Sequence, residues 1–186
     1  MAGMGKTVEG GSTIIPESIL NGKRILAVDD EPDVLTVLEE EILEACPDCK
    51  FDKATTYPEA ARKMSAHRYD LVVLDIMGVR GFELLDVAVK QKLPVAMLTA
   101  HALTPEALTQ SIQMMARVYL PKEKMGEIVP FLEYVLKYEY LNGWNVLLKK
   151  LKGFFNERWG KDWQKTHESF WKEFNTKLLK CKLDIP

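Results

Sequence analysis

Cysteine and histidine are scarce in this chain, with three of each among 186 residues. Cys46 and Cys49 form a C-x-x-C pair, a spacing found in redox sites and in halves of zinc sites. No second pair follows, and His67, His101 and His167 are not spaced like zinc-finger ligands. A redox C-x-x-C usually opens a helix after a strand, whereas this one follows a predicted helix. The two cysteines are therefore interpreted as ordinary loop thiols in a reducing, cytoplasmic protein.

Long apolar runs are also missing. No stretch of about 18 uninterrupted apolar residues exists, so we expect no membrane span. Residues 1–21 are small and polar and lack the apolar block of a secretory signal, which predicts a disordered lead-in. Apolar residues make up 47% of the chain and charged residues 28%, as in ordinary soluble globular proteins.

The formal net charge of −2 conceals an uneven distribution. Residues 1–140 contain 15 Lys/Arg and 22 Asp/Glu, whereas residues 141–186 contain 10 and 5. An acidic first part and a basic last part indicate two modules with different roles. We expect a compact domain at residues 22–128 and a C-terminal extension at residues 129–186.

Five short apolar runs alternate with amphipathic segments in the first 122 residues. The runs, which lack polar alternation and fit buried parallel strands, are Arg24–Val28, Phe51–Ala54, Leu71–Leu74, Pro94–Leu98 and Arg117–Leu120. The segments between them predict helices at Glu31–Ala45, Ala60–His67, Phe82–Lys90 and Pro105–Met115. This alternation predicts an α/β fold with a doubly wound, five-stranded parallel sheet in the order 2-1-3-4-5, which is the flavodoxin-like arrangement.

The pattern changes after Lys122. Apolar residues advance by three or four from about Glu123 to Asn156, which predicts one long fifth helix with Gly143 as a point of kinking. Gly160 ends this run, and Asp162–Cys181 predicts a second amphipathic helix. We therefore expect the long helix to continue into a helical hairpin.

Charged and polar side chains follow the ends of several predicted strands. Asp29 and Asp30 follow the first strand, Asp75 the third, Thr99 the fourth and Lys122 the fifth. The carboxyl ends of parallel strands share one edge of the sheet, and ligands bind there near the point where strand order reverses. Clustered carboxylates suit a hard cation such as Mg²⁺, and an ammonium and a hydroxyl suit a phosphoryl group. This combination predicts phosphoryl transfer to a carboxylate.

Four segments together resemble the receiver domain of two-component response regulators. They read KRILAVDDEPDVLTVLEEEI, LVVLDIMGVRGFELL, PVAMLTAHA and VYLPKE, and the resemblance covers about residues 22–128. It implies that Asp75 is the phosphoacceptor and that Mg²⁺ is held by Asp30, Asp75, the Met77 carbonyl and, through water, Asp29. It also implies that Thr99, Lys122 and the Ala100 backbone stabilise the phosphoryl group, with Thr99 and Tyr119 as the switch residues.

The same resemblance implies a signalling protein that is not an enzyme. Its partners would be a sensor histidine kinase or a histidine phosphotransfer protein, and its output would be protein–protein interaction. A homodimer could form through the face made by the fourth helix, fifth strand and fifth helix, or through the C-terminal helices. The alternatives are a receiver fold that binds partners independently of phosphorylation, and a basic, aromatic tail that contacts nucleic acid or membrane.

Two features depart from the family pattern. The loop after Asp75, including Gly78–Gly81, is two residues shorter than usual and lacks the family's proline. Arg80 in this loop either reaches the site or faces solvent. The order Pro121-Lys122 also reverses the usual Lys-Pro.

Two other chemistries on the same fold are disfavoured. A flavin-phosphate loop would not carry Asp29 and Asp30, and a haloacid-dehalogenase-type phosphatase needs a second aspartate at the position of Met77.

Overall fold

The computed structural model describes residues 18–101 and 103–181. A five-stranded, all-parallel sheet in the order β2-β1-β3-β4-β5 forms its centre. The strands are β1 (Arg24–Val28), β2 (Lys50–Ala54), β3 (Leu71–Asp75), β4 (Val95–Thr99) and β5 (Val118–Pro121). The predicted fold class and strand order are therefore confirmed.

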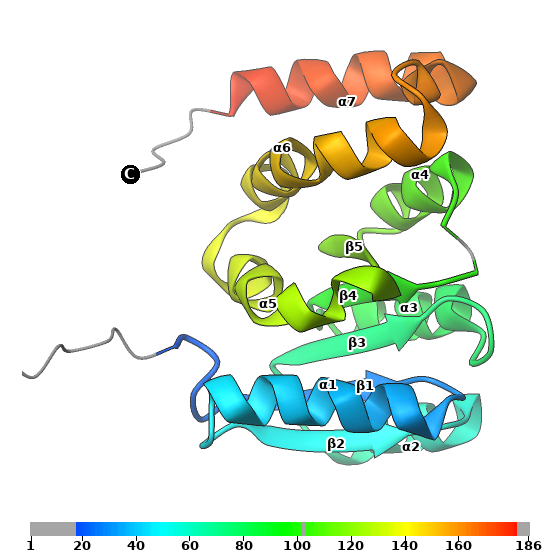
Figure 1. The fold of residues 1–186 in the computed structure, drawn as a ribbon. Helices are drawn as coiled ribbons and strands as arrows, with labels where there is room; N and C mark the ends of the chain where they lie inside the picture. Colours follow the sequence, from blue (N-terminus) through cyan, green and yellow to red (C-terminus); the bar gives the residue numbers. More distant parts are fainter. Residues whose placement is uncertain (1–17, 102, 182–186) are drawn as a thin grey trace, which may run out of the picture.

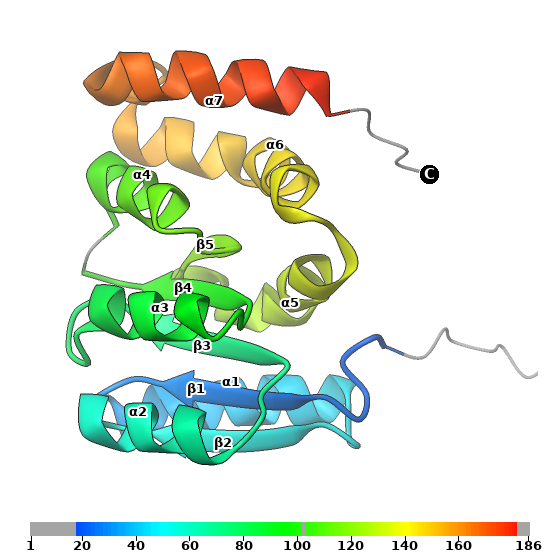
Figure 2. The ribbon, with the colours of Figure 1, turned by 180° about the vertical axis from the view of Figure 1, so that it is seen from behind.

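Five α-helices connect or follow the strands: α1 (Pro32–Ala45), α2 (Tyr57–Ala66), α3 (Gly81–Lys90), α4 (Pro105–Gln113) and α5 (Ile128–Lys137). α1 and α5 cover one face of the sheet (Figure 1), and α2, α3 and α4 cover the other (Figure 2). β3 and β4 are buried along their whole length, as expected for central strands with helices on both faces.

Local sequence signals explain where the helices begin. Thr56 caps α2 by accepting a hydrogen bond from the Glu59 amide at 3.4 Å, and Thr104 caps α4 through the Ala107 amide at 3.1 Å. Proline occupies the first turn of α1, α2 and α4, where a missing amide hydrogen costs nothing.

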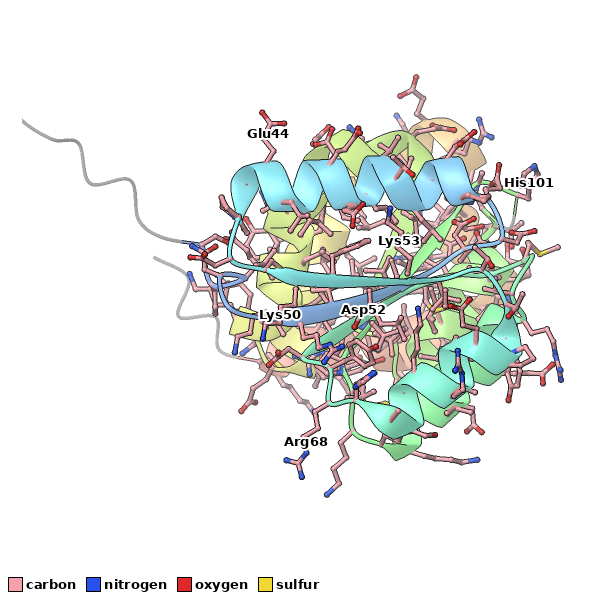
Figure 3. The ribbon with its side chains drawn as sticks, turned by 90° about the horizontal axis from the view of Figure 1, so that it is seen from below. Glu44, Lys50, Asp52, Lys53, Arg68 and His101 are labelled. Carbon is pink, nitrogen blue, oxygen red and sulfur yellow. The ribbon has the colours of Figure 1, made fainter. Side chains whose placement is uncertain are left out.

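The two edges of the sheet are protected differently. β2 carries charged side chains at Lys50, Asp52 and Lys53, which lie along its open edge (Figure 3). Two of them form ion pairs, Asp52 with Arg24 at 2.7 Å and Lys53 with Glu39 at 2.5 Å. The β5 edge is instead covered by the C-terminal helix α6 (Figure 1). Charge on one edge and a helix over the other both oppose strand addition from another chain.

The C-terminal region corrects the prediction of one continuous helix from Glu123 to Asn156. A 3₁₀ helix, η1 (Lys122–Glu127), leads into α5, and a new helix, α6 (Tyr140–Trp159), begins after a break at residues 138–139. Tyr138 and Glu139 both have extended backbone dihedrals. The predicted kink at Gly143 is wrong, because this residue lies inside α6 and donates its amide to the Glu139 carbonyl at 2.8 Å.

Arg117 supplies the physical reason for the break. Its guanidinium donates to the carbonyl of Val135 at 3.1 Å and also to the carbonyl of Tyr138. Carbonyls in the last turn of a helix lack partners within the helix. The half-buried guanidinium of Arg117, the residue just before β5, satisfies them here, and α5 ends at this point.

α6, the 3₁₀ helix η2 (Trp163–His167) and α7 (Glu168–Lys180) form a second layer beside the sheet. Figure 1 shows α7 returning alongside α6, as the predicted hairpin requires. Large side chains fill this layer and are buried: Trp144, Phe155, Trp163, Trp171 and Phe174. These aromatic residues of the basic tail therefore form a core against the rest of the chain. None of the helices in the described ranges has the length and apolar character that a bilayer span needs.

Other predictions concern the start of the chain and the cysteines. Residues 1–17 of the predicted lead-in lie outside the described residues. Its last residues, Ser18–Asn21, form a turn in which Leu20 is fully buried, so that part of the lead-in is ordered. Cys46 and Cys49 are free, buried thiols, and burial raises the pKa of Cys49 to about 11. A thiol that resists ionisation suits the loop interpretation better than a redox role.

The position of Gly143 generates a test of the corrected helix. A Cβ at this position would meet only the Tyr138 Cβ, at 3.8 Å, which is ordinary contact. We expect Gly143→Ala to raise the free energy of unfolding by roughly 0.5–1 kcal/mol, because alanine loses less backbone entropy than glycine in a helix. Urea denaturation measures the change. Gly153→Ala, at an exposed position of α6 with open space, is the matched control. Destabilisation at Gly143 together with stabilisation at Gly153 would contradict a regular helix at Gly143.

Candidate functional site

Three aspartates meet at the carboxyl end of the sheet. Asp29 follows β1, Asp30 comes next, and Asp75 is the last residue of the neighbouring strand β3. One carboxylate oxygen from each lies within 4.8 Å of the others. Asp29 and Asp75 are buried while Asp30 is exposed, so the cluster has two inner carboxylates and one open to solvent. The predicted convergence of these side chains is what the structure shows.

Lys122, the residue directly after β5, is the cation of this cluster. Its Nζ atom lies 2.8 Å from Asp29 Oδ2, 2.8 Å from Glu31 Oε1 and 3.4 Å from Asp75 Oδ1. Burial disfavours the charged form of Lys122, but the hydrogen bonds to Asp29 and Glu31 and the charge of Asp75 outweigh it and raise the pKa of the ammonium. The partnership with Glu31 was not predicted, although its place next to Asp30 in the sequence was a signal.

The cluster keeps an excess of negative charge. Burial raises the pKa of Asp29, although the hydrogen bond from Lys122 works in the opposite direction. That same lysine holds the pKa of Glu31 below its ordinary value. One ammonium therefore contacts three carboxylates, and Asp30 adds a fourth negative charge beside them. Because two of these carboxylates are buried, an added cation would relieve the repulsion. A hard divalent cation with oxygen preference, such as Mg²⁺, fits this donor set.

The backbone that follows β3 orients the Asp75 carboxylate. Its Oδ2 atom accepts hydrogen bonds from the amides of Met77 at 2.9 Å and Gly78 at 3.1 Å. Oδ1 lies 3.4 Å from the Lys122 ammonium. One oxygen is thus held by the loop, while the other faces the ammonium.

The shortened loop depends on two glycines. A Cβ on Gly78 would lie 1.9 Å from Oδ1 of Asp30, and a Cβ on Gly81 would lie 2.0 Å from the Asp75 carbonyl. The clash at Gly81 is with backbone atoms, so the compact loop requires glycine there. A side chain at Gly78 would instead have to displace the exposed Asp30 carboxylate. The Met77 carbonyl, predicted to bind metal, accepts a 3.4 Å hydrogen bond from the Arg80 amide. A carbonyl has a second lone pair, so this bond leaves an acceptor site.

The side chain of Arg80 makes its contacts on the protein surface. It adopts a left-handed backbone with φ of 57°. Its guanidinium pairs with Glu83 and lies 4.6 Å from the centre of the Tyr57 ring. These contacts agree with the solvent-facing alternative for this residue.

The predicted phosphoryl-stabilising and switch residues lie on β4 and β5. Thr99 is the buried last residue of β4, directly after Leu98, which pairs with Asp75 across the sheet. Ala100 is exposed at the start of the next loop. Tyr119 is fully buried, and its hydroxyl accepts a hydrogen bond from the Thr104 amide at 3.3 Å. The roles of these residues stay predictions.

Comparison with known proteins identifies the family. The sequence model of the response regulator receiver domain matches residues 25–132, more than half of the chain. This chain belongs to the response regulator receiver family. α6 and α7 lie beyond the matched residues.

Individual relatives agree with this assignment. The two-component response regulator ORR21 of Oryza sativa is 30% identical over 146 residues, which is 74% of this chain and 20% of ORR21. ARR18 of Arabidopsis thaliana is 36% identical over 87 residues, 44% of this chain and 13% of ARR18. The chain therefore spans a fifth or less of the length of these relatives.

Solved structures show the same receiver architecture. The response regulator TrrA of Thermotoga maritima, determined in complex with Mg²⁺-BeF, is 34% identical with a TM-score of 0.53, covering 61% of this chain and 99% of TrrA. The chemotaxis protein CheY4 of Vibrio cholerae is 25% identical with a TM-score of 0.55, covering 61% and 98%. These comparisons cover about three-fifths of the chain.

The charge excess predicts how the cluster binds metal. We expect Asp30→Asn to weaken Mg²⁺ binding by roughly tenfold or more, since even lost outer-shell partners of a metal cost that much. Titration calorimetry measures the affinity.

Asp48→Asn is the matched control for this measurement. It removes the same charge from an exposed position just before β2, at the other end of the sheet, and should leave the affinity unchanged. Equal losses in both variants would mean that net charge, not the cluster, governs the binding.

Proposed function

We propose that this chain is a phosphoryl-accepting response regulator whose Asp75 receives the group from a sensor histidine kinase or a histidine phosphotransfer protein. One observation carries the proposal. The buried Asp75 carboxylate is oriented by the amides of Met77 and Gly78 and lies 3.4 Å from the Lys122 ammonium, beside two further aspartates. Membership of the receiver family supports the same chemistry.

One set of residues at the site would bind the metal ion, and another would bind the phosphoryl group. Asp30, Asp75 and the Met77 carbonyl would hold Mg²⁺, with Asp29 acting through a water molecule. Bound Mg²⁺ supplies positive charge that offsets the charge of the phosphoryl oxygens. Thr99, Lys122 and the amide of Ala100 would hold the phosphoryl oxygens in place.

The transfer needs little covalent assistance from the protein. A bond forms between an Asp75 carboxylate oxygen and phosphorus while the phosphorus–nitrogen bond of the donor phosphohistidine breaks. The electron pair returns to the donor imidazole, which takes a proton from solvent. A carboxylate nucleophile has no proton to lose, so no general base is required, and positioning with charge neutralisation provides the acceleration. Because Asp75 is itself modified, we assign the chain a signalling role and not that of an enzyme.

The output would be a protein–protein interaction, and the position of α6 limits where it occurs. α6 and η2 pack against β5 and α4. A homodimer through the face made by α4, β5 and α5 would therefore have to displace the chain's own C-terminal helices. This arrangement favours output through α6 and α7. The free, buried thiols of Cys46 and Cys49 support a reducing compartment such as the cytoplasm.

Direct phosphorylation tests the proposal. Incubation with acetyl phosphate and Mg²⁺ should add the mass of one phosphoryl group, in a bond that is stable to acid and labile to base. Asp75→Ala should abolish the gain because it removes the carboxylate that the Met77 and Gly78 amides orient beside Lys122. Intact-protein mass spectrometry measures it, and Asp48→Asn serves as the matched aspartate control. If the wild type gains no mass from acetyl phosphate or from a phosphohistidine donor, the phosphorylation-independent binding module is the better interpretation.

A further inference from the structure

The peptide group between Leu103 and Thr104 is held from both sides. Its N–H, on Thr104, donates to the Tyr119 hydroxyl at 3.3 Å. Its carbonyl, on Leu103, accepts from the indole Nε1 of Trp159 at 3.1 Å. Tyr119 lies on β5, and Trp159 is the last residue of α6. One peptide plane thus joins the predicted switch tyrosine to the end of the C-terminal helix.

α6 also contacts the other end of α4. Tyr140 donates its hydroxyl to the Ile112 carbonyl, and Trp144 donates its indole nitrogen to the Ala116 carbonyl at 2.9 Å. Together with Trp159, three aromatic side chains of α6 donate to carbonyls that flank or end α4. α4 is therefore bonded to α6 at both of its ends, and not merely covered by it.

The aromatic packing around Trp159 limits its freedom. Its ring stacks on Phe155 with centroids 4.6 Å apart and planes 3° from parallel, and it meets Trp163 edge to face at 5.3 Å. A donor held in this way cannot follow a moving carbonyl by simple side-chain rotation. Leu103 is buried, so loss of the bond would leave its carbonyl poorly satisfied. A shift of this peptide would therefore move the end of α6 or break the bond.

We propose that the Leu103–Thr104 peptide relays the phosphorylation state of Asp75 to the C-terminal helices, with Trp159 as the positioning residue that responds to it. The proposal rests on the proposed function. Thr99 is the last residue of β4, and a connection of four residues joins it to Thr104, the N-cap of α4. A phosphoryl group that draws Thr99 toward Asp75 would pull on this connection and on the peptide at its end. η2, which packs against α4, would move with α6.

Hydrogen exchange of the full-length chain tests the relay, with Mg²⁺ and beryllium fluoride as the phosphoryl mimic. In the wild type, the mimic should change amide exchange by at least about twofold both at the start of α4 and in residues 155–167. Trp159→Phe keeps an aromatic ring but lacks the N–H donor. It should retain the change at α4 and lose most of the change in residues 155–167.

Trp163→Phe provides the matched control. Its indole nitrogen donates to Asn156 Oδ1 at 3.2 Å, within the C-terminal layer, so it removes the same kind of donor without touching Leu103. It should respond like the wild type. An undiminished response in Trp159→Phe would overturn the relay, as would an equal loss in Trp163→Phe, which would implicate general packing of the aromatic cluster.

A second measurement does not depend on phosphorylation. In the protein without mimic, Tyr119→Phe and Trp159→Phe should each speed exchange of the Ala107 amide, which reports the α4 cap. In the double variant, the change in the Ala107 exchange rate should differ from the product of the two single changes by at least about twofold, because both hydrogen bonds act on one peptide group.

For Tyr119→Phe combined with Trp163→Phe, the change in the Ala107 exchange rate should equal the product of the two single changes. If the Tyr119→Phe, Trp159→Phe double variant also equals the product of its single changes, the coupling is refuted. If the mimic fails to bind at Asp75 but the first pair is coupled, the proposed function fails while the physical link stands.

Discussion

The ion pairing of Lys122 with the carboxylates at the end of the sheet is the constraint on which the site depends. Three acidic side chains lie within 3.4 Å of this one ammonium, and Asp30 completes the cluster. Burying Asp29 and Asp75 without a cation would be costly. Lys122 lowers that cost but does not cancel the charge. The site therefore retains an excess of negative charge that a further cation would offset.

Parallel strand pairing makes this cluster possible. β1 and β3 are neighbours and run in the same direction, so Asp29 and Asp75 end at one edge of the sheet. The sequence was sufficient to predict this, because each strand is a short apolar run and each chemical group follows directly after it. Strand order, the convergence of the three aspartates and the approach of Lys122 could all be inferred from these positions. The sequence also showed the glycines of the compact loop. It did not show that a Cβ at Gly78 would meet the Asp30 carboxylate, which only the folded structure reveals.

The C-terminal region could not be predicted in the same way. Helical periodicity runs through residues 138–139 without interruption, and nothing local distinguishes this point from its surroundings. The break depends on Arg117, which is some twenty residues earlier in the chain and reaches the end of α5 only in the folded protein. Gly143 was the local signal for a kink, and tertiary contacts overrode it. Helix propensity describes which residues a helix tolerates, whereas the hydrogen bonds from the Arg117 guanidinium determine where this helix ends.

Long-range contacts also explain why the C-terminal extension packs against β5 and α4. β5 would otherwise be an open edge strand, and α4 would present unpaired carbonyls at its C-terminal end. α6 covers the β5 edge. Its Tyr140 and Trp144 side chains also donate hydrogen bonds to the carbonyls at the C-terminal end of α4. A layer attached in this way senses the position of α4 through directional bonds as well as through apolar contact. Since hydrogen bonds weaken steeply with distance and angle, a small shift of α4 has a larger effect on this attachment than on a purely apolar one. On the proposed relay, the C-terminal helices are thus placed where a shift of α4 would reach them through hydrogen bonds as well as through packing.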